Sequence, residues 1–226
     1  GPAGSAEMTV QPLDTPNGPA RLFVNAPSTP PRAVLLLGHG AGGGVEAFDL
    51  AALAERLPAA GIAVVRFEQP WRTAGRRVAG PPACLDAAWR PALAWTATAF
   101  PGVPLFVGGR SAGARVACRC FEEPARGVVA ISFPLHPPGR PERSRAPELA
   151  RVAARALVIQ GERDPFGTPD EVRGALAALG AAPSKLVTVP GAAHSFELRT
   201  KAARDRAEET AAMIAGAVVD WVGVSR

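Results

Sequence analysis

The chain has 226 residues, of which 47% are hydrophobic and 20% charged, and it contains 24 glycines and 24 prolines. This balance indicates one globular domain and excludes a disordered or low-complexity chain. The net charge of +5 comes almost entirely from scattered arginines, tyrosine is absent and no basic run exceeds two residues, which argues against a nucleic-acid-binding surface.

Apolar runs and helical periodicities alternate along the chain, in an order that predicts the fold class. A polar, Gly/Pro-rich loop is expected over 68–82 and a Pro/Arg-rich loop over 134–148. The alternation predicts a parallel, doubly wound α/β sheet with helices on both faces and no large lid. Strands are expected at 21–25, 33–37, 62–67, 104–108, 127–133, 156–161 and 185–189; helices are expected over 50–57, over 85–93 with a kink or restart at Pro91, over 112–121, over 169–179, and from 207 onward.

The chain termini and cysteines carry weaker signals. Residues 1–8 (GPAGSAEM) lack the pattern of a signal peptide, so we expect a vector-derived or disordered remnant there and a single domain over 9–226. The run AAMIAGAVV is too short to span a bilayer. Cys84, Cys118 and Cys120 have neither disulfide nor zinc spacing, which favours reduced thiols in a cytoplasmic protein. We expect no metal, cofactor, nucleic acid or membrane partner, and the oligomeric state stays open.

Reactive residue types follow several of the predicted strands. Ser111 lies in a G-x-S-x-G motif directly after the strand at 104–108, Asp164 follows the strand at 156–161, and His194 follows the strand at 185–189. The glycine-rich turn HGAGGG follows the strand at 33–37. Because the carboxyl ends of parallel strands meet at one edge of a sheet, these groups are expected to lie together.

A serine, a histidine and an aspartate together can perform nucleophilic catalysis. The hydroxyl of Ser111 is a poor nucleophile unless a base such as the imidazole of His194 takes its proton. The carboxylate of Asp164 would fix the tautomer of that imidazole and stabilise its charged form. The backbone N–H groups of Ala112 and Ala41, with Gly42 as the alternative to Ala41, are expected to form an oxyanion hole.

Each of these residues also has an ordinary structural interpretation. Ser111 could cap a helix, Asp164 could be a turn residue before a proline, and His194 could be a surface-loop histidine. For His39 we favour a structural role that supports the glycine-rich turn. The coincidence of four strand ends, each with the expected group in the expected order, favours the catalytic interpretation.

Several strings resemble a known family over nearly the whole chain: LLGHGAGG, GGRSAGARVA, SFPLHPPGRPER and LVIQGERDPFGTPDEV. They resemble the α/β-hydrolase superfamily, and more narrowly the small hydrolase-like branch related to dienelactone hydrolases. That branch includes the hydrolase-like domains of the testis-expressed and non-specific-lethal-complex proteins. The resemblance implies Ser111 as nucleophile, Asp164 as acid and His194 as base. The chain departs from the branch at Ala112 and Ala114, where Met and Gly are usual, and the small Ala112 is expected to widen the pocket.

The pocket wall is expected to come from the loops at 68–82 and 134–148, with arginines that suit a small, anionic acyl substrate. Pairing of these arginines with Glu142 and Glu148 is the alternative. The sequence therefore predicts a serine hydrolase acting on a small carboxylic ester, thioester or lactone. The alternatives are a non-catalytic interaction module and, less favoured because no cap or propeller domain is present, a peptidase. The candidate substrate-binding residues are His39, Trp71, Arg110, His136 and Arg140.

Overall fold

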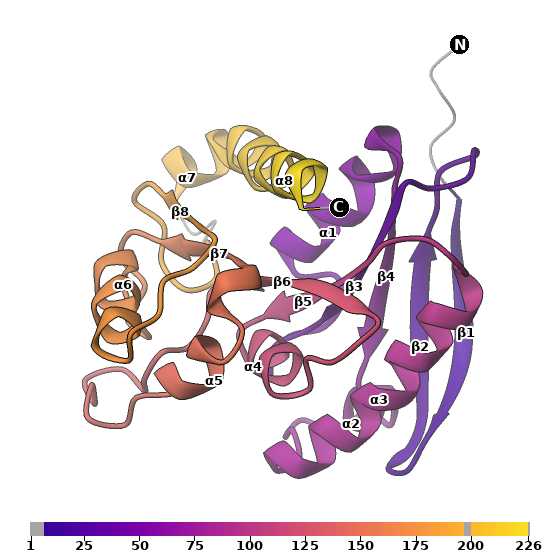
Figure 1. The fold of residues 1–226 in the computed structure, drawn as a ribbon, viewed down its shortest axis with the longest axis horizontal. Coiled ribbons are helices and arrows are strands. Elements are labelled where there is room, and N and C mark those ends of the chain that lie inside the picture. The colour runs from indigo at the N-terminus through magenta and orange to yellow at the C-terminus, as the bar shows by residue number, and fades with distance from the viewer. Residues whose placement is uncertain (1–6, 197–199, 226) are drawn as a thin grey trace.

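Eight strands form one sheet in the computed structural model, which describes residues 7–196 and 200–225 (Figure 1). The strands are β1 (Met8–Thr15), β2 (Gly18–Asn25), β3 (Ala33–Gly38), β4 (Ile62–Glu68), β5 (Leu105–Arg110), β6 (Ala125–Ile131), β7 (Ala156–Gly161) and β8 (Lys185–Val189). Their spatial order is β1-β2-β4-β3-β5-β6-β7-β8. β1 pairs antiparallel with β2, and β2 antiparallel with β4, whereas every pair from β4 to β8 is parallel.

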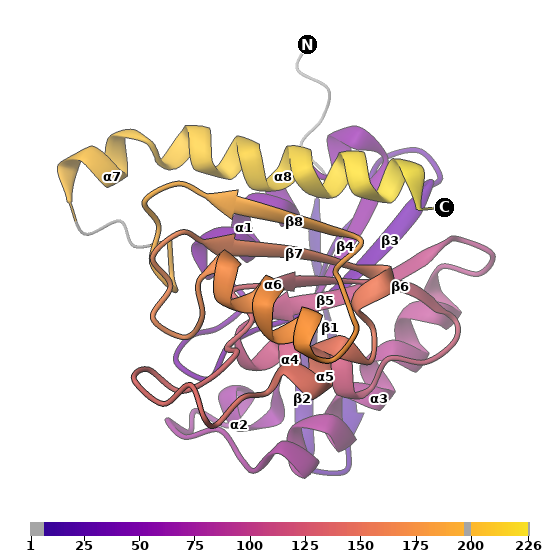
Figure 2. The ribbon, with the colours of Figure 1, turned by 60° about the vertical axis from the view of Figure 1, so that its left-hand side comes forward.

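Helices cover both faces of this sheet. The longer ones are α1 (Phe48–Arg56), α3 (Pro82–Ala99), α4 (Ala112–Arg119), α6 (Pro169–Ala178) and α8 (Ala207–Val224); the shorter ones are α2 (Pro70–Thr73), α5 (Ala146–Ala150) and α7 (Lys201–Asp205). Figures 1 and 2 show α1 and α8 together on one face, with α3, α4, α5 and α6 on the other. The predicted fold class, a mostly parallel and doubly wound α/β sheet, is confirmed.

The buried strands explain why the core has two halves. Along β3, Leu35 and Leu37 pack with α1 and α8, while Val34 and Leu36 pack with α3 and α4. Successive side chains on a strand point to opposite faces, so a strand covered on both faces is mostly apolar. All six residues of β3 are buried, as are all residues of β4, β5 and β7.

The structure differs from the sequence expectations in several places. β1 was not expected, and it begins at Met8; residues 1–6, where a remnant was expected, lie outside the described residues. β1 is an exposed edge strand that contains Pro12, so it lacks the apolar run of a central strand. α3 runs as one helix through Pro91 instead of restarting there, and α4 ends at Arg119, two residues earlier than expected.

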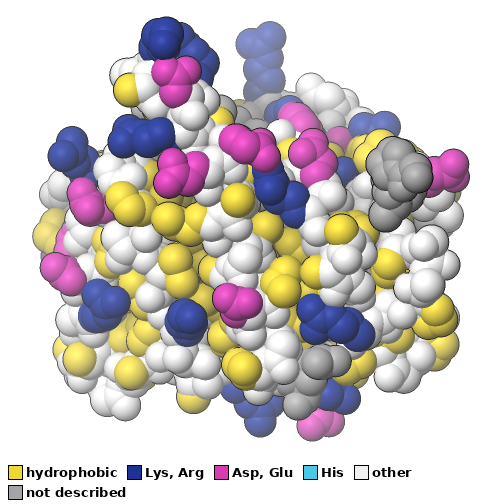
Figure 3. Space-filling view, turned by 90° about the horizontal axis from the view of Figure 1, so that it is seen from above, with side chains coloured by type: hydrophobic (Ala, Val, Ile, Leu, Met, Phe, Trp, Pro, Cys, Tyr) yellow, Lys and Arg dark blue, Asp and Glu magenta, His cyan; other side chains and the backbone are white. Residues whose placement is uncertain are grey.

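Charge distribution, helix hydropathy and possible metal ligands can be described for the residues that the structure covers. On the face that α8 covers, acidic and basic side chains are interspersed, with no patch of one sign (Figure 3). None of the helices in that part is both long and apolar enough to cross a bilayer. Its His, Cys, Asp and Glu side chains also form no group of three that could hold a metal ion.

Candidate active site

Ser111 lies in a sharp turn between β5 and α4, with φ 53° and ψ −116°. This is a strained backbone conformation for a residue with a side chain, and such strain is concentrated at functional sites. The turn brings α4 so close to β3 that a Cβ on Gly109 or Gly113 would lie 2.6 Å or 2.4 Å from the carbonyl oxygen of Gly38. Both positions therefore require glycine, which explains the spacing of the G-x-S-x-G motif.

Three side chains from separate loops form one hydrogen-bonded chain at the carboxyl edge of the sheet. The Nε2 atom of His194 lies 2.9 Å from Ser111 Oγ, and its Nδ1 atom lies 2.9 Å and 3.1 Å from the two carboxylate oxygens of Asp164. A carboxylate can only accept, so Nδ1 carries the proton and Nε2 is free to accept from the serine hydroxyl. The three residues expected at the strand ends thus meet in the expected order.

Asp164 is held in one orientation by groups that the sequence alone does not single out. Its side chain is buried, with the residue only 1% exposed, and the backbone N–H of Phe166 donates to Oδ1 at 2.8 Å. The Phe166 ring also lies against the His194 imidazole, with ring centroids 4.2 Å apart. Buried Gln160 donates to the Gly167 carbonyl at 2.8 Å. It also donates to the carbonyl of Phe133 and accepts from its N–H, so the loop that carries Asp164 is held to the end of β6.

The backbone of His194 is fixed by two donors to its carbonyl oxygen. Arg110 Nη2 donates at 2.8 Å and Ser132 Oγ donates at 2.7 Å. Arg110 is itself buried, 8% exposed, and pairs through Nη1 with Asp49 Oδ2 at 3.3 Å. Burial raises the pKa of Asp49, and the Arg110 guanidinium offsets part of that shift. Arg110, a candidate substrate contact in the sequence, is thus engaged with Asp49 and the histidine loop.

These contacts predict a defined effect of removing Arg110. Because Arg110→Met alone would leave Asp49 buried and unpaired, the informative variant is Asp49→Asn/Arg110→Met. We expect kcat of the esterase reaction proposed below to fall about 10–100-fold with KM nearly unchanged, because the His194 loop loses a positioning contact. Steady-state kinetics on a neutral ester measures both constants. A large rise in KM with kcat unchanged would instead mean that Arg110 binds the substrate.

The glycine-rich turn after β3 lies against Ser111, where an oxyanion hole is expected. A Cβ on Gly40 would lie 3.5 Å from Ser111 Cβ, and Ala112 is the first residue of α4. Within the described residues, the backbone N–H groups of Ala41 and Ala112 have no hydrogen-bond acceptor. The same is true of Gly42, the alternative donor. Amides at a helix N-terminus and in such a turn are well placed to bind negative charge.

His39 holds the glycine-rich turn in place through hydrogen bonds of its side chain. Its Nε2 accepts from the backbone N–H of Gln69 at 3.0 Å, so Nδ1 carries the proton and donates to the carbonyl of Gly40 at 2.8 Å. Burial lowers the pKa of His39, which keeps the ring neutral. The Trp71 ring packs edge-on against it at 5.6 Å. These contacts agree with the structural role favoured for His39.

Residues 31–223, most of the chain, match the family model described as the alpha/beta hydrolase domain. The chain belongs to the α/β-hydrolase family. Membership identifies it as an α/β-hydrolase-type enzyme, as the sequence predicts, and agrees with the resemblance to the branch related to dienelactone hydrolases.

Several solved structures share the fold at low sequence identity. A lidless α/β serine hydrolase from Xanthomonas campestris is 23% identical, with 98% of each chain covered and a TM-score of 0.73. Est1E from Butyrivibrio proteoclasticus, solved with ferulic acid bound, is 14% identical over 94% of this chain and 99% of its own, with a TM-score of 0.73. A hyperthermophilic esterase from the archaeon Pyrobaculum calidifontis is 20% identical over 96% and 86%, with a TM-score of 0.65.

Two of the candidate substrate contacts in this α/β hydrolase lie away from the cavities beside Ser111. His136 is buried; its Nε2 lies 2.7 Å from Glu171 Oε2, and its Nδ1 lies 2.7 Å from the carbonyl of Pro137. Burial alone favours the neutral ring, but these two acceptors outweigh it and raise the pKa of His136. His136 therefore ties the 134–148 loop to α6. Arg140 is exposed and lies 4.0 Å from Glu142, in keeping with the pairing alternative.

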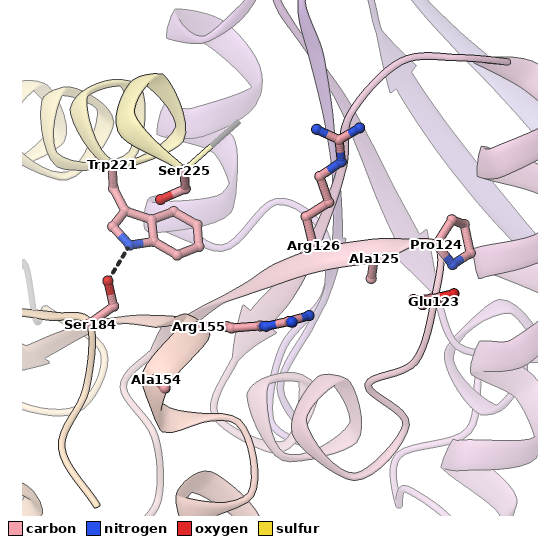
Figure 4. Close-up of a pocket in the computed structure, with 9 residues that line it drawn as sticks. All are labelled: Glu123, Pro124, Ala125, Arg126, Ala154, Arg155, Ser184, Trp221 and Ser225. Carbon is pink, nitrogen blue, oxygen red and sulfur yellow. Dashed lines mark hydrogen bonds between the residues drawn. The ribbon is translucent and has the colours of Figure 1, made fainter.

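The cavity at Ser111 has a smaller volume than a second cavity elsewhere in the structure. A cavity of about 320 Å³ is lined by Ser111, His194, Arg110 and the glycine-rich turn. Another, of about 490 Å³, lies at the opposite edge of the sheet, where β6 and β7 begin, and is lined by Arg126, Arg155 and Trp221 among others (Figure 4). No histidine lines it, whereas the residues expected to be catalytic, Ser111 and His194, line the smaller cavity.

Two of the three cysteines, Cys118 and Cys120, offer no rival nucleophile. All three are free thiols. Burial raises the pKa of Cys118 to about 12 and that of Cys120 to about 11, so both remain protonated at neutral pH. Because the thiolate is the reactive form, these two side chains act as small apolar core residues.

Proposed function

We propose that this α/β hydrolase is a serine hydrolase that cleaves a small carboxylic ester, thioester or lactone through a covalent acyl-enzyme. Ser111 is the nucleophile, His194 the general base and Asp164 the residue that orients the base. The observation that carries the proposal is the chain of hydrogen bonds from Ser111 Oγ through the imidazole to the Asp164 carboxylate, at 2.9 Å on each side of the ring.

In the first half-reaction Ser111 Oγ attacks the carbonyl carbon of the substrate while its proton moves to His194 Nε2. The carbonyl oxygen becomes an oxyanion, which the N–H groups of Ala41 and Ala112 stabilise. Asp164 stabilises the imidazolium, since its carboxylate accepts from Nδ1. The tetrahedral intermediate then breaks the bond to the leaving oxygen or sulfur, which takes the proton from Nε2 and departs as an alcohol or thiol.

In the second half-reaction a water molecule replaces the leaving group. His194 Nε2 takes one proton from the water, whose oxygen attacks the acyl carbon. The intermediate collapses, the bond to Ser111 Oγ breaks, and Nε2 returns the proton to that oxygen. The products are the free carboxylic acid and the restored serine hydroxyl, so one water is consumed for each ester cleaved. Every group in the cycle comes from the chain itself, the substrate or water.

Short-chain activated esters test this proposal directly. The purified protein is expected to hydrolyse p-nitrophenyl acetate and p-nitrophenyl butyrate without added metal or cofactor, because nucleophile, base and oxyanion donors all come from the protein. Release of p-nitrophenolate, measured with and without a chelator, checks the expectation. If release does not exceed that of a heat-denatured sample, the proposed serine-hydrolase reaction is wrong.

A further inference from the structure

Two cavities adjoin at the glycine-rich turn beside Ser111, and they differ in which expected catalytic groups line them. The cavity of about 320 Å³ contains His194 and Ser195, and is completed by Phe48 and the glycine-rich turn. A separate crevice is lined by Ala112, and by Ala41, which it shares with the first cavity; neither Ser111 nor His194 lines it. The two spaces share Gly40 and Ala41, so they adjoin at the glycine-rich turn.

Proton transfer decides which part of an ester occupies each space. The departing oxygen must lie within hydrogen-bond reach of His194 Nε2 to receive its proton. The alcohol or thiol part therefore extends into the cavity that His194 lines. The carbonyl oxygen points to the amides of Ala41 and Ala112, and the acyl chain then has the crevice beside those residues.

The crevice is far smaller than the cavity on the leaving-group side. Its free volume is about 10 Å³, against about 320 Å³, and about 10–15 Å³ is the space that one water molecule needs. Its walls include three buried side chains: the rings of Trp71 and Trp89, and the side chain of Leu85 on α3. We propose that this enzyme is selective for acetyl-sized acyl groups on a much larger alcohol or thiol, an inference that rests on the proposed serine-hydrolase function.

Trp71 lines both the crevice and a third cavity, so its indole forms part of the wall between them. That outer cavity, of about 310 Å³, is also lined by Gln69, Trp71 and Leu85, and continues to Val78 and Cys84. Trp71 is only 7% exposed and is held edge-on against His39. Removing the indole would join the crevice to the outer cavity and give a longer acyl chain a place to lie.

Two isomeric esters distinguish selectivity for the acyl chain from a general preference for hydrophobic substrates. Hexyl acetate and ethyl hexanoate have the same formula but exchange the long and short chains across the ester bond. Wild-type enzyme is expected to hydrolyse hexyl acetate at least about 10-fold faster in kcat/KM, because a long acyl chain does not fit the crevice. Titration of the released acid measures both rates. Equal rates, or a preference for ethyl hexanoate, would overturn the inference.

Variants at the dividing wall test the role of Trp71. Trp71→Ala is expected to raise kcat/KM for ethyl hexanoate relative to hexyl acetate about 10-fold or more, whereas Trp71→Phe, which retains an aromatic wall, should shift the ratio little. Leu85→Ala opens the same wall from α3 and provides the test if Trp71→Ala does not fold. A folded variant at either position with the wild-type ratio would overturn the role of the wall.

The same experiment distinguishes this inference from the function on which it rests. If only the acyl selectivity is wrong, both esters are hydrolysed, either at equal rates or with ethyl hexanoate preferred. Ser111 then still reacts with a fluorophosphonate. If neither ester is hydrolysed and Ser111 takes no label, the proposed function has failed, and the acyl selectivity with it.

Discussion

Ser111→Ala is expected to lower kcat for p-nitrophenyl acetate by about 10⁴-fold or more. The alanine cannot form the acyl bond, and the remaining His194–Asp164 pair has no hydroxyl to activate. Ser111 sits at φ 53° in a turn that its flanking glycines dictate, so replacing its hydroxyl leaves the backbone contacts of the turn in place. KM is expected to change little, because the side chain contributes chemistry more than binding.

A matched serine elsewhere controls for this substitution. Ser184 lies at the opposite edge of the sheet, where its Oγ accepts from Trp221 Nε1 at 3.3 Å (Figure 4). Ser184→Ala should retain wild-type kcat. Retention of most activity by folded Ser111→Ala would show that another group performs the reaction.

Asp164→Asn is expected to lower kcat by about 10⁴-fold while the protein remains folded. The Phe166 N–H holds Oδ1, so the asparagine amide group would replace Oδ2, the atom 2.9 Å from His194 Nδ1. Two donors cannot face each other, and the imidazole would move its proton to Nε2. In that tautomer Nε2 cannot accept the proton of Ser111, although all three side chains stay in place.

Asp170→Asn provides the control, because it also replaces a carboxylate by an amide, six residues after Asp164. Asp170 lies in the first turn of α6; its side chain is exposed and, among residues 7–196 and 200–225, pairs only with Arg173, at 3.5 Å. The control should keep wild-type activity, since exposed pairs contribute little. Equal, small losses in both asparagine variants would mean that Asp164 does not orient His194.

Much of the fold was predictable because the central strands carry an unambiguous signal. β3 and β7 are buried on both faces, so their sequences, AVLLLG and ALVIQG, are nearly continuous apolar runs. A parallel sheet places the ends of such strands at one edge, so the contact among Ser111, Asp164 and His194 could be expected from chain order alone. β1 was not predictable in this way, because it is an exposed edge strand with few buried side chains.

The contacts that position the catalytic groups were less accessible from the sequence. Asp49 and Arg110 are 61 residues apart, and nothing in the local pattern around either residue indicates that they pair beneath the histidine loop. Ser132 follows β6 with φ 51° and donates to the His194 carbonyl; its place at a strand end was the available signal. His136 looked like a pocket residue, but its two ring nitrogens are taken up by Pro137 and Glu171.

Mapping the adduct of a fluorophosphonate probe by peptide mass spectrometry tests the central claim most directly. The reagent reacts with a serine only where a base activates the hydroxyl. We expect one adduct per chain, on the peptide that contains Ser111, with no labelling of Ser111→Ala and strongly slowed labelling of Asp164→Asn. An unlabelled wild-type protein, or an adduct on any other serine, would contradict it.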